Sequence, residues 1–148
     1  MTLNDEFTQK VITSIQVPEN RFHPLVHILG NPRIGSGTSI GLFSEINANG
    51  AEVVIGKSCD IASFVAINAA DSHLKTIGLS DTIARKDIRI GNHVFVGSHT
   101  FIGGYVDIGD NSVVGAGTIL INKGKIPPYS LIIGNPAVVR EGYFRDKI

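Results

Sequence analysis

The chain has 148 residues, and its 13 Lys and Arg residues balance its 13 Asp and Glu residues, so the formal net charge is zero. This length is enough for one domain with a sizeable core, and the lack of a basic surplus argues against a partner that is nucleic acid or a membrane surface. We expect no membrane insertion, because no apolar run approaches the roughly 18 residues that cross a bilayer and residues 1–6 have no signal-peptide pattern. A single cysteine, Cys59, excludes an intrachain disulfide, so we expect a cytoplasmic protein.

Residues 1–20 are predicted to form a short amphipathic helix. Leu3, Phe7, Val11 and Ile15 recur at every fourth position, which places them on one face of a helix, and Pro18 follows them. The simplest role for such a helix is to cap the open edge of the structure that follows. The sequence therefore predicts an N-terminal cap over 1–20 and a main domain over 21–148.

From residue 28 onward, an apolar residue recurs at every sixth position. The count slips by three residues once and is broken once, and every anchor is Ile, Val or Leu. These three residue types make up 42 of the 148 residues, so chance does not produce sixteen anchors in this order. The anchors are Ile28, Ile34, Ile40, Ile46, Ile55, Ile61, Ile67, Ile90, Val96, Ile102, Ile108, Val114, Leu120, Ile126, Ile132 and Val138.

A strict period of six with β-branched anchors does not fit the 3.6-residue period of a helix. It predicts an all-β solenoid of short strands, in which each anchor points inward and stacks on the anchors of neighbouring turns. The residue after the anchor is often glycine, which we expect to permit the backbone of a tight corner. The fifth position is often small or β-branched and is also expected to point inward. Cys59 holds this position, which predicts a buried, inert thiol.

Residues 73–89 interrupt the repeat between the hexads that begin at Ile67 and Ile90. A break of 17 residues in a short domain is more often functional than idle. The segment is rich in charge, so we expect a solvated loop that protrudes from the solenoid.

The segment 88–119, IRIGNHVFVGSHTFIGGYVDIGDNSVVGAGTI, resembles the C-terminal coils of hexapeptide-repeat acyltransferases. The segment 126–141, IPPYSLIIGNPAVVRE, is similar to their closing segment, and the pattern is most like that of the galactoside and maltose O-acetyltransferases and of polysaccharide-locus acetyltransferases. This resemblance implies a left-handed parallel β-helix of about five coils, with three hexads in each triangular coil. It also implies a homotrimer that uses acetyl-coenzyme A as co-substrate.

Transfer of an acyl group to a hydroxyl or amine needs a base for the acceptor proton, and an imidazole, with a pKa of about 6.5, suits that role. His73 lies where the resembling enzymes place their catalytic histidine. Asp71, two residues away, is assigned to the acceptor side, where it is able to orient the ring. His99, in a Gly-Ser-His segment typical of the family, is the alternative base or else a contact of the coenzyme or of the trimer. The remaining histidines are expected at packing or surface positions: His23, His27 and His93.

The resemblance also assigns a coenzyme site. Ser98 and Ala116, with their neighbours His99 and Gly117, match residues that line the pantetheine groove. Lys123 and Arg140 match residues that contact the coenzyme, and Lys125 is the alternative to Lys123 because residues 120–125 form a segment about two residues longer than usual. For the acceptor, Asn47 or Asn49 lies near a family asparagine that binds sugar hydroxyls.

Together these features predict an acyl-coenzyme A-dependent acetyltransferase that acts on a sugar hydroxyl in glycan or surface-polysaccharide metabolism, with no metal. An N-acetyltransferase for an amino-sugar nucleotide uses the same coils. Two further alternatives share the fold. One is a zinc hydratase similar to γ-carbonic anhydrase, which needs three converging histidines such as His73, His93 and His99. The other is a non-catalytic β-helix scaffold.

Overall fold

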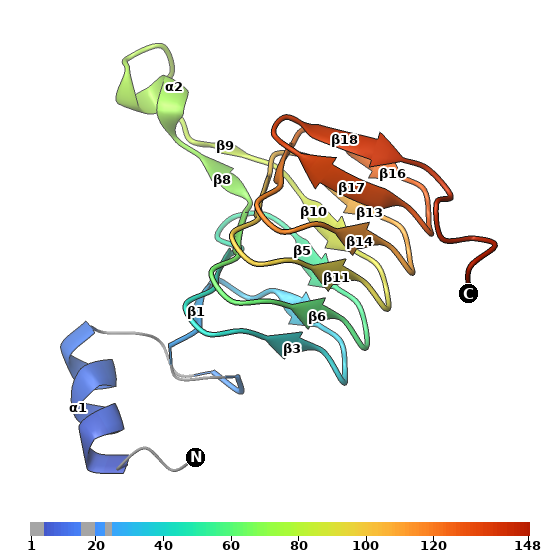
Figure 1. The fold of residues 1–148 in the computed structure, drawn as a ribbon. Coiled ribbons are helices and arrows are strands. Elements are labelled where there is room, and N and C mark those ends of the chain that lie inside the picture. Colours follow the sequence, from blue (N-terminus) through green and yellow to red (C-terminus); the bar gives the residue numbers. More distant parts are fainter. Residues whose placement is uncertain (1–4, 16–19, 23–24) are drawn as a thin grey trace.

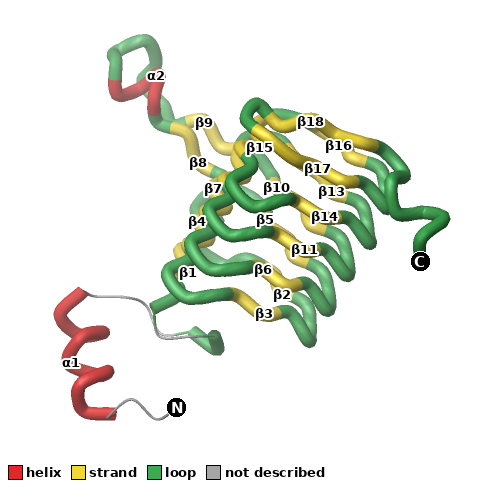
Figure 2. Tube along the Cα trace, in the orientation of Figure 1, coloured by secondary structure: helices red, strands yellow, loops and turns green. Residues whose placement is uncertain are grey.

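The computed structural model describes residues 5–15, 20–22 and 25–148, and its main body is a left-handed parallel β-helix (Figure 1). Three sheets, here called sheets A, B and C, form the three faces of a prism, and the chain visits them in turn. Their strands are parallel, except for the last strand of sheet C. Each sheet receives one strand from each of five coils, as the resemblance implied. Figure 2 shows how short these strands are relative to the corners that join them.

The strands are listed here by sheet. Sheet A contains β1 (His27–Leu29), β4 (Glu45–Asn47), β7 (Ala66–Asn68), β12 (Phe101–Gly103) and β15 (Ile119–Ile121). Sheet B contains β2 (Arg33–Ile34), β5 (Val53–Ile55), β10 (Ile88–Ile90), β13 (Val106–Ile108) and β16 (Gly124–Ile126). Sheet C contains β3 (Ser39–Ile40), β6 (Asp60–Ile61), β11 (Phe95–Val96), β14 (Val113–Val114), β17 (Leu131–Gly134) and β18 (Ala137–Arg140).

The anchors fill the interior of the prism as predicted. Ile46 pairs with Ile67 in sheet A, and Ile102 pairs with Leu120, so that side chains of neighbouring coils stack in register and are fully buried. The fifth-position side chains are buried as well, and their hydroxyl groups donate to backbone carbonyl oxygens, for example from Thr38 to Gly56 at 2.7 Å. Cys59 is buried among them, and burial raises the pKa of its thiol, which agrees with the prediction of an inert side chain.

The last anchor is an exception. Val138 is 60% exposed, whereas Ala137 is buried. The chain turns back after β17, and β18 pairs with it in the antiparallel direction instead of starting another coil. The prediction of a sixteenth inward hexad was therefore wrong, because a hairpin strand follows the sheet's two-residue alternation and not the six-residue count.

The second-position glycines do not have the role that the sequence suggested. Their φ values are ordinary, and what they allow is close approach between coils. A Cβ at Gly97 would lie 2.4 Å from the backbone nitrogen of Ala116, and one at Gly109 would lie 2.4 Å from that of Pro128. A left-handed backbone occurs instead at the fourth position of hexads in sheets B and C, where the chain turns toward the next sheet. Most of these residues are not glycine. The non-glycine residues are Phe43, Ser58, Phe64, His93, His99, Asn111 and Tyr129.

The predicted protruding loop is an arm that leaves the prism after β7 (Figure 1). Two short antiparallel strands, β8 (Ala70–Asp71) and β9 (Ala84–Arg85), form its base, and helix α2 (His73–Thr76) lies beyond them. The guanidinium of Arg85 donates to the carbonyl oxygen of Asn49, which fastens the base of the arm to the coil below. The predicted bounds of 73–89 shift toward the N-terminus, because Ile88 is already buried in β10.

Helix α1 (Asp5–Ile15) forms where the four-residue spacing predicted it, and Figure 1 shows it beside the N-terminal end of the prism. Leu3 and Pro18 lie outside the described residues, and the role of the helix as a cap stays a prediction. The free edge of the first coil has other partners. The guanidinium of Arg21 donates to the carbonyl oxygen of Ile34 at 2.8 Å, and the side-chain amide of Asn20 donates to that of Val26 at 2.8 Å. Among the helices described, none is long and apolar enough to span a membrane.

Candidate active site

A pocket of about 500 Å³ lies between the arm and the carboxyl ends of the strands of sheet A. The prism side of the pocket comes from three successive strands, because Asn68, Gly103 and Ile121 are aligned across β7, β12 and β15. The arm side consists of residues 70–73, Thr76 and Ile77. The arm therefore forms this pocket by leaning over the coils that follow it in the chain.

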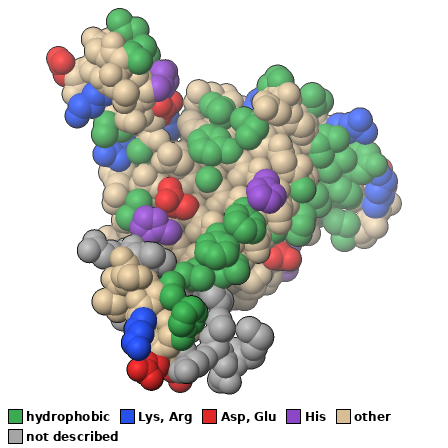
Figure 3. Space-filling model, turned by 60° about the vertical axis from the view of Figure 1, so that its left-hand side comes forward, with side chains coloured by type: hydrophobic (Ala, Val, Ile, Leu, Met, Phe, Trp, Pro, Cys, Tyr) green, Lys and Arg blue, Asp and Glu red, His purple; other side chains and the backbone are tan. Residues whose placement is uncertain are grey.

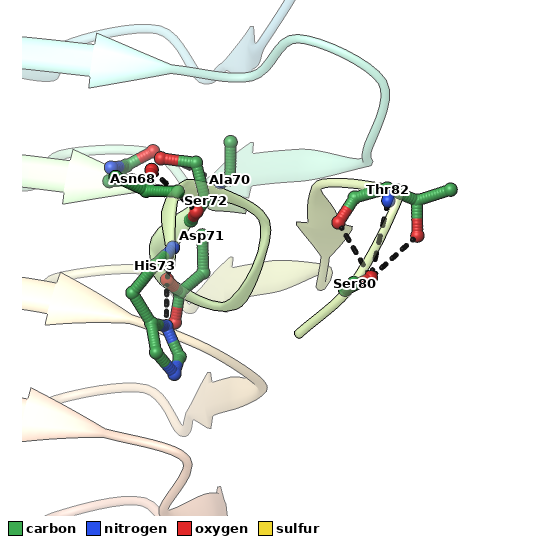
Figure 4. A network of polar contacts seen from close by, with 8 residues as sticks. Asn68, Ala70, Asp71, Ser72, His73, Ser80 and Thr82 are labelled. Atoms are coloured by element: carbon green, nitrogen blue, oxygen red, sulfur yellow. Dashed lines mark hydrogen bonds and ion pairs between the residues drawn. The ribbon is translucent and has the colours of Figure 1, made fainter. Parts of the chain in front are cut away.

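His73 lines this pocket from the first position of α2, and its ring is held by Asp71 (Figure 4). The carboxylate Oδ1 of Asp71 accepts hydrogen bonds from the backbone N–H of His73, at 3.1 Å, and from the ring Nδ1. Because a carboxylate only accepts, Nδ1 carries the proton and the lone pair is left on Nε2. Nε2 has no hydrogen-bond partner among the described residues, so it is available to a ligand.

The charge of Asp71 is stabilised by the same contacts. Hydrogen bonding from the His73 side chain and backbone lowers the pKa of the Asp71 carboxyl below its usual value near 3.8. Asp71 is thus ionised throughout the neutral range and keeps the His73 ring in one orientation and one tautomer.

A second feature lies at the opposite edge of sheet A, at the amino ends of its strands, where the chain arrives from sheet C. This corner is here called the C–A corner. Ser98 and Ala116 lie there on neighbouring coils, and the backbone N–H of Gly117 donates to the carbonyl oxygen of Ser98 at 2.9 Å. The backbone N–H groups of Ser98 and Ala116 donate to no described residue. Gly117 has no atoms within 4 Å of the place that a Cβ would take, so the surface beside it is open.

Three rings form a column along the same corner on the earlier coils. Phe43 stacks on Phe64 with ring centroids 5.4 Å apart, and Phe64 stacks on His99 at 5.0 Å with planes only 5° from parallel. Figure 3 shows hydrophobic side chains gathered in an oblique row on this face. His99 is the last ring of the column, because Gly117 takes the next place. Its imidazole is thus fixed by stacking, some distance from the pocket around His73.

The two features do not meet within one chain. Strand β12 and its flanking residues separate the C–A corner from the edge that carries the arm, a span of roughly 15 Å at about 3.3 Å per residue. The residues predicted to line the pantetheine groove and the residue predicted to act as base therefore lie at opposite edges of sheet A.

The chain matches no protein-family model and no curated protein sequence. Its structure is similar to solved structures of acyltransferases. A galactoside acetyltransferase in complex with coenzyme A has a TM-score of 0.71 and 29% sequence identity, covering 99% of this chain and 76% of that one. The polySia-specific acetyltransferase NeuO has a TM-score of 0.61 and 29% identity, covering 78% of this chain and 56% of that one. A variant of AntD, an N-acyltransferase from Bacillus cereus bound to coenzyme A and dTDP-4-amino-4,6-dideoxyglucose, shares the fold with a TM-score of 0.72 and 20% identity, covering 84% of this chain and 70% of that one.

The chain thus shares the left-handed β-helix fold and the six-residue repeat of hexapeptide-repeat acyltransferases. The resemblance seen in its C-terminal coils therefore extends to the whole prism. The fold brings some of the sequence-predicted residues together and leaves others apart.

The three cations that the resemblance predicts lie at three places around the last coil. Lys123 follows β15 at the edge of sheet A that carries the arm, whereas Lys125 lies on β16 in sheet B, in register with Asp107. Arg140 ends β18 in sheet C and pairs with Leu131. Lys123 is thus the predicted cation that shares an edge with His73, and a role for Lys125 or Arg140 on the same coenzyme molecule stays a prediction.

The predicted acceptor residues Asn47 and Asn49 do not line the pocket around His73. They shape the turn after β4, where Asn47 Oδ1 accepts a hydrogen bond from the backbone N–H of Asn49 at 3.1 Å. The residue aligned with Asn47 on the next coil, Asn68, does line the pocket, and its Oδ1 accepts from the backbone N–H of Ala70 at 3.0 Å. The role of Asn47 and Asn49 in acceptor binding stays a prediction.

The remaining histidines lie apart from this pocket. His93 lies at the corner between sheets B and C, where its backbone N–H donates to the carbonyl oxygen of Lys57 at 2.9 Å, and His27 contacts Glu45 on sheet A at 3.0 Å. His23 is outside the described residues. One chain therefore does not bring His73, His93 and His99 together, and no three metal-binding side chains cluster in the part that the structure describes.

Of the pocket residues, sequence reasoning found only Asp71 and His73, and it missed the prism side, which includes Asn68, Phe101 and Ile121. Asn68 carries a signal, since it directly follows Ile67, the last anchor before the break, and ends β7. Phe101 and Ile121 carry none, because they look like ordinary outward positions of a hexad. They become site residues only because the arm leans over them.

Proposed function

We propose that this protein transfers the acetyl group of acetyl-coenzyme A to a hydroxyl group of a sugar, with His73 as general base. The observation that carries the proposal is the Asp71–His73 pair, which presents an unpartnered Nε2 to a pocket of about 500 Å³. The related structures support the chemistry, since one is a galactoside acetyltransferase in complex with coenzyme A. That the chain is an acyl-coenzyme A-dependent acetyltransferase follows from this kinship, and the sugar acceptor is the proposed part.

The reaction requires only one proton to be held by the protein. Nε2 of His73 takes the proton of the acceptor hydroxyl while its oxygen attacks the thioester carbonyl carbon, so that a C–O bond forms. The C–S bond then breaks, and the imidazolium returns the proton to the departing thiolate of coenzyme A. Asp71 stabilises the imidazolium that forms between the two steps.

The C–A corner is the proposed binding site of the thioester and of the pantetheine chain of the coenzyme. The backbone N–H groups of Ser98 and Ala116 point to no other described group and are spaced by one coil, about 4.8 Å. Amide carbonyls along a pantetheine chain, or the oxyanion of the transition state, are suitable acceptors for such donors. Gly117 leaves the groove open beside them.

We further propose that the active site is completed by a second copy of the chain in a homotrimer. The thioester groove and the base lie at opposite edges of sheet A, so they meet only if the arm of one copy reaches the C–A corner of its neighbour. The arm carries apolar side chains suited to such a contact, since Ile77 is 65% exposed and Leu79 is 74% exposed. Covering these side chains would remove apolar area from water.

The proposal is tested by incubating the protein with acetyl-coenzyme A and a panel of methyl glycosides, while the free thiol of coenzyme A is measured. We expect thiol release that depends on the sugar, together with an O-acetylated product in the mass spectrum. Release with amino-sugar nucleotides alone would favour N-acetylation instead, and AntD, which binds a dTDP-amino sugar, provides the precedent. No release with any acceptor, in protein that fails to bind coenzyme A, would contradict the proposal.

A further inference from the structure

We infer that Phe101 is the platform on which the acceptor sugar ring packs, and that Gly103 is the residue that creates it. This inference rests on the proposed function. The side chain of Phe101 is on the outer face of β12 and lines the same pocket as His73. It thus lies where an acceptor must lie if Nε2 of His73 is to reach the acceptor's hydroxyl.

The ring of Phe101 is able to lie flat on the strand because Gly103, two residues further along the same face, has no side chain. A Cβ at Gly103 would lie 2.6 Å from Cε1 and 2.9 Å from Cζ of Phe101, so the ring occupies the space above this glycine. Phe101 is flanked on the same face by Ala66 on one coil and Ile119 on the next. The ring is therefore laid along the sheet toward the arm instead of standing out from the surface.

The groups around this platform define a chemical class of ligand. Asn68, Ser72 and Thr76 line the pocket and offer hydrogen-bonding side chains, while Ile121, 46% exposed, extends the apolar floor. Asp71 and His73 are the charged or titratable members of the lining, and no Lys or Arg contributes to it among the described residues. A flat apolar floor with amide and hydroxyl groups at its rim suits an uncharged pyranose ring, which has one apolar face and polar edges. It does not suit a phosphate or carboxylate group, which would need a cation.

Kinetics with two acceptors test the inference. The probes are the best methyl pyranoside of the panel and glycerol, which has hydroxyl groups but no flat apolar face. Phe101→Ala is expected to raise KM for the pyranoside about tenfold and to leave kcat/KM for glycerol nearly unchanged. Phe101→Tyr, which keeps the ring, is expected to retain the KM of the parent protein. Gly103→Ala is expected to act like Phe101→Ala, because its methyl group displaces the ring.

Phe95→Ala is the matched control, since Phe95 is a 40% exposed phenylalanine on the outer face of sheet C, away from the pocket. The Kd of coenzyme A, measured by calorimetry, reports whether each variant is folded. Equal losses with pyranoside and glycerol in folded Phe101→Ala, or no loss with either, would overturn the platform. A parent protein that acetylates glycerol or an amine but no pyranoside would instead contradict the sugar acceptor itself, and the platform with it.

Discussion

Two side chains on one tight turn carry the proposed chemistry. Asp71 and His73 are two residues apart, and the bond between them exists because the backbone turns into α2 between the two. The sequence order alone indicated that Asp71 was able to orient the ring. Which ring nitrogen stays free depends on the turn itself, which leaves Nε2 as the atom available to the acceptor.

Replacing His73 removes the proposed base. His73→Ala is expected to lower kcat by about 10²–10⁴-fold, the usual contribution of a positioned base, and to leave the Kd of coenzyme A nearly unchanged. Steady-state kinetics and calorimetry measure the two quantities. His99→Ala is the comparison variant and should act on coenzyme affinity or on assembly, because its ring stacks on Phe64 at the other edge of sheet A. A hundredfold loss of kcat in His99→Ala with little loss in His73→Ala would reverse the assignment.

The pH dependence of kcat reports on the charge of Asp71. The pKa of Asp71 is lowered by its contacts with His73, so Asp71 is ionised at every pH above its usual value near 3.8, and its support of the ring is lost only as the pH falls below that value. Between pH 5 and 9, a range of roughly four units, we therefore expect no loss of kcat from protonation of Asp71.

Asp71→Asn tests this interpretation. The amide keeps the size of the side chain but no longer stabilises an imidazolium, so kcat should fall at least about tenfold throughout that pH range. Steady-state kinetics at several pH values measure the fall. An unchanged kcat would show that the contact with Asp71 has no part in the proton transfer.

At the scale of the coil, the six-residue period predicted a solenoid of short strands whose anchors point inward. The left-handed triangular coil of three hexads was implied by the resemblance to hexapeptide-repeat acyltransferases. The period could not predict the hairpin of β17 and β18 or the lining of the pocket. Asn68, Phe101 and Ile121 are 33 and 20 residues apart in sequence. They lie on neighbouring coils because the arm is inserted within the third coil, between β7 and β10, and leaves the stacking of the coils intact.

The spacing between coils explains the second-position glycines and is open to test. Gly97→Ala adds a methyl group 2.4 Å from the backbone nitrogen of Ala116, which neither coil can avoid without a shift. We expect a loss of about 1–3 kcal/mol in the free energy of unfolding, measured by urea titration. Gly124→Asn is the control, because Gly124 has a φ of 67°, which asparagine tolerates, and a Cβ there would lie 3.9 Å from its nearest contacts, two ring atoms of Tyr105. Equal stability of the two variants would contradict this role for the glycines.

At the scale of the whole molecule, the coenzyme should stabilise the folded protein. A ligand that binds only the native state adds about 2.7 kcal/mol at a hundredfold excess over its Kd, which raises Tm. Replacing Lys123 and Lys125 together by alanine should reduce the shift, because the phosphates of coenzyme A lose cationic partners. Arg33→Ala, on sheet B of the first coil and ion-paired with Glu52 at 3.2 Å, is the control. No change in Tm at millimolar coenzyme A would count against acyl transfer as a whole.

Subunit mixing tests whether each active site is shared between two copies of the chain. His73→Ala lacks the base, and Ala116→Trp fills the proposed thioester groove, so each variant alone should be inactive. Mixed in equal amounts, refolded together and confirmed as trimers by light scattering, they should regain about a quarter of the parent activity, because one site in four joins an intact arm to an intact groove. Mixed trimers that remain as inactive as the separate variants would contradict a site built from two copies.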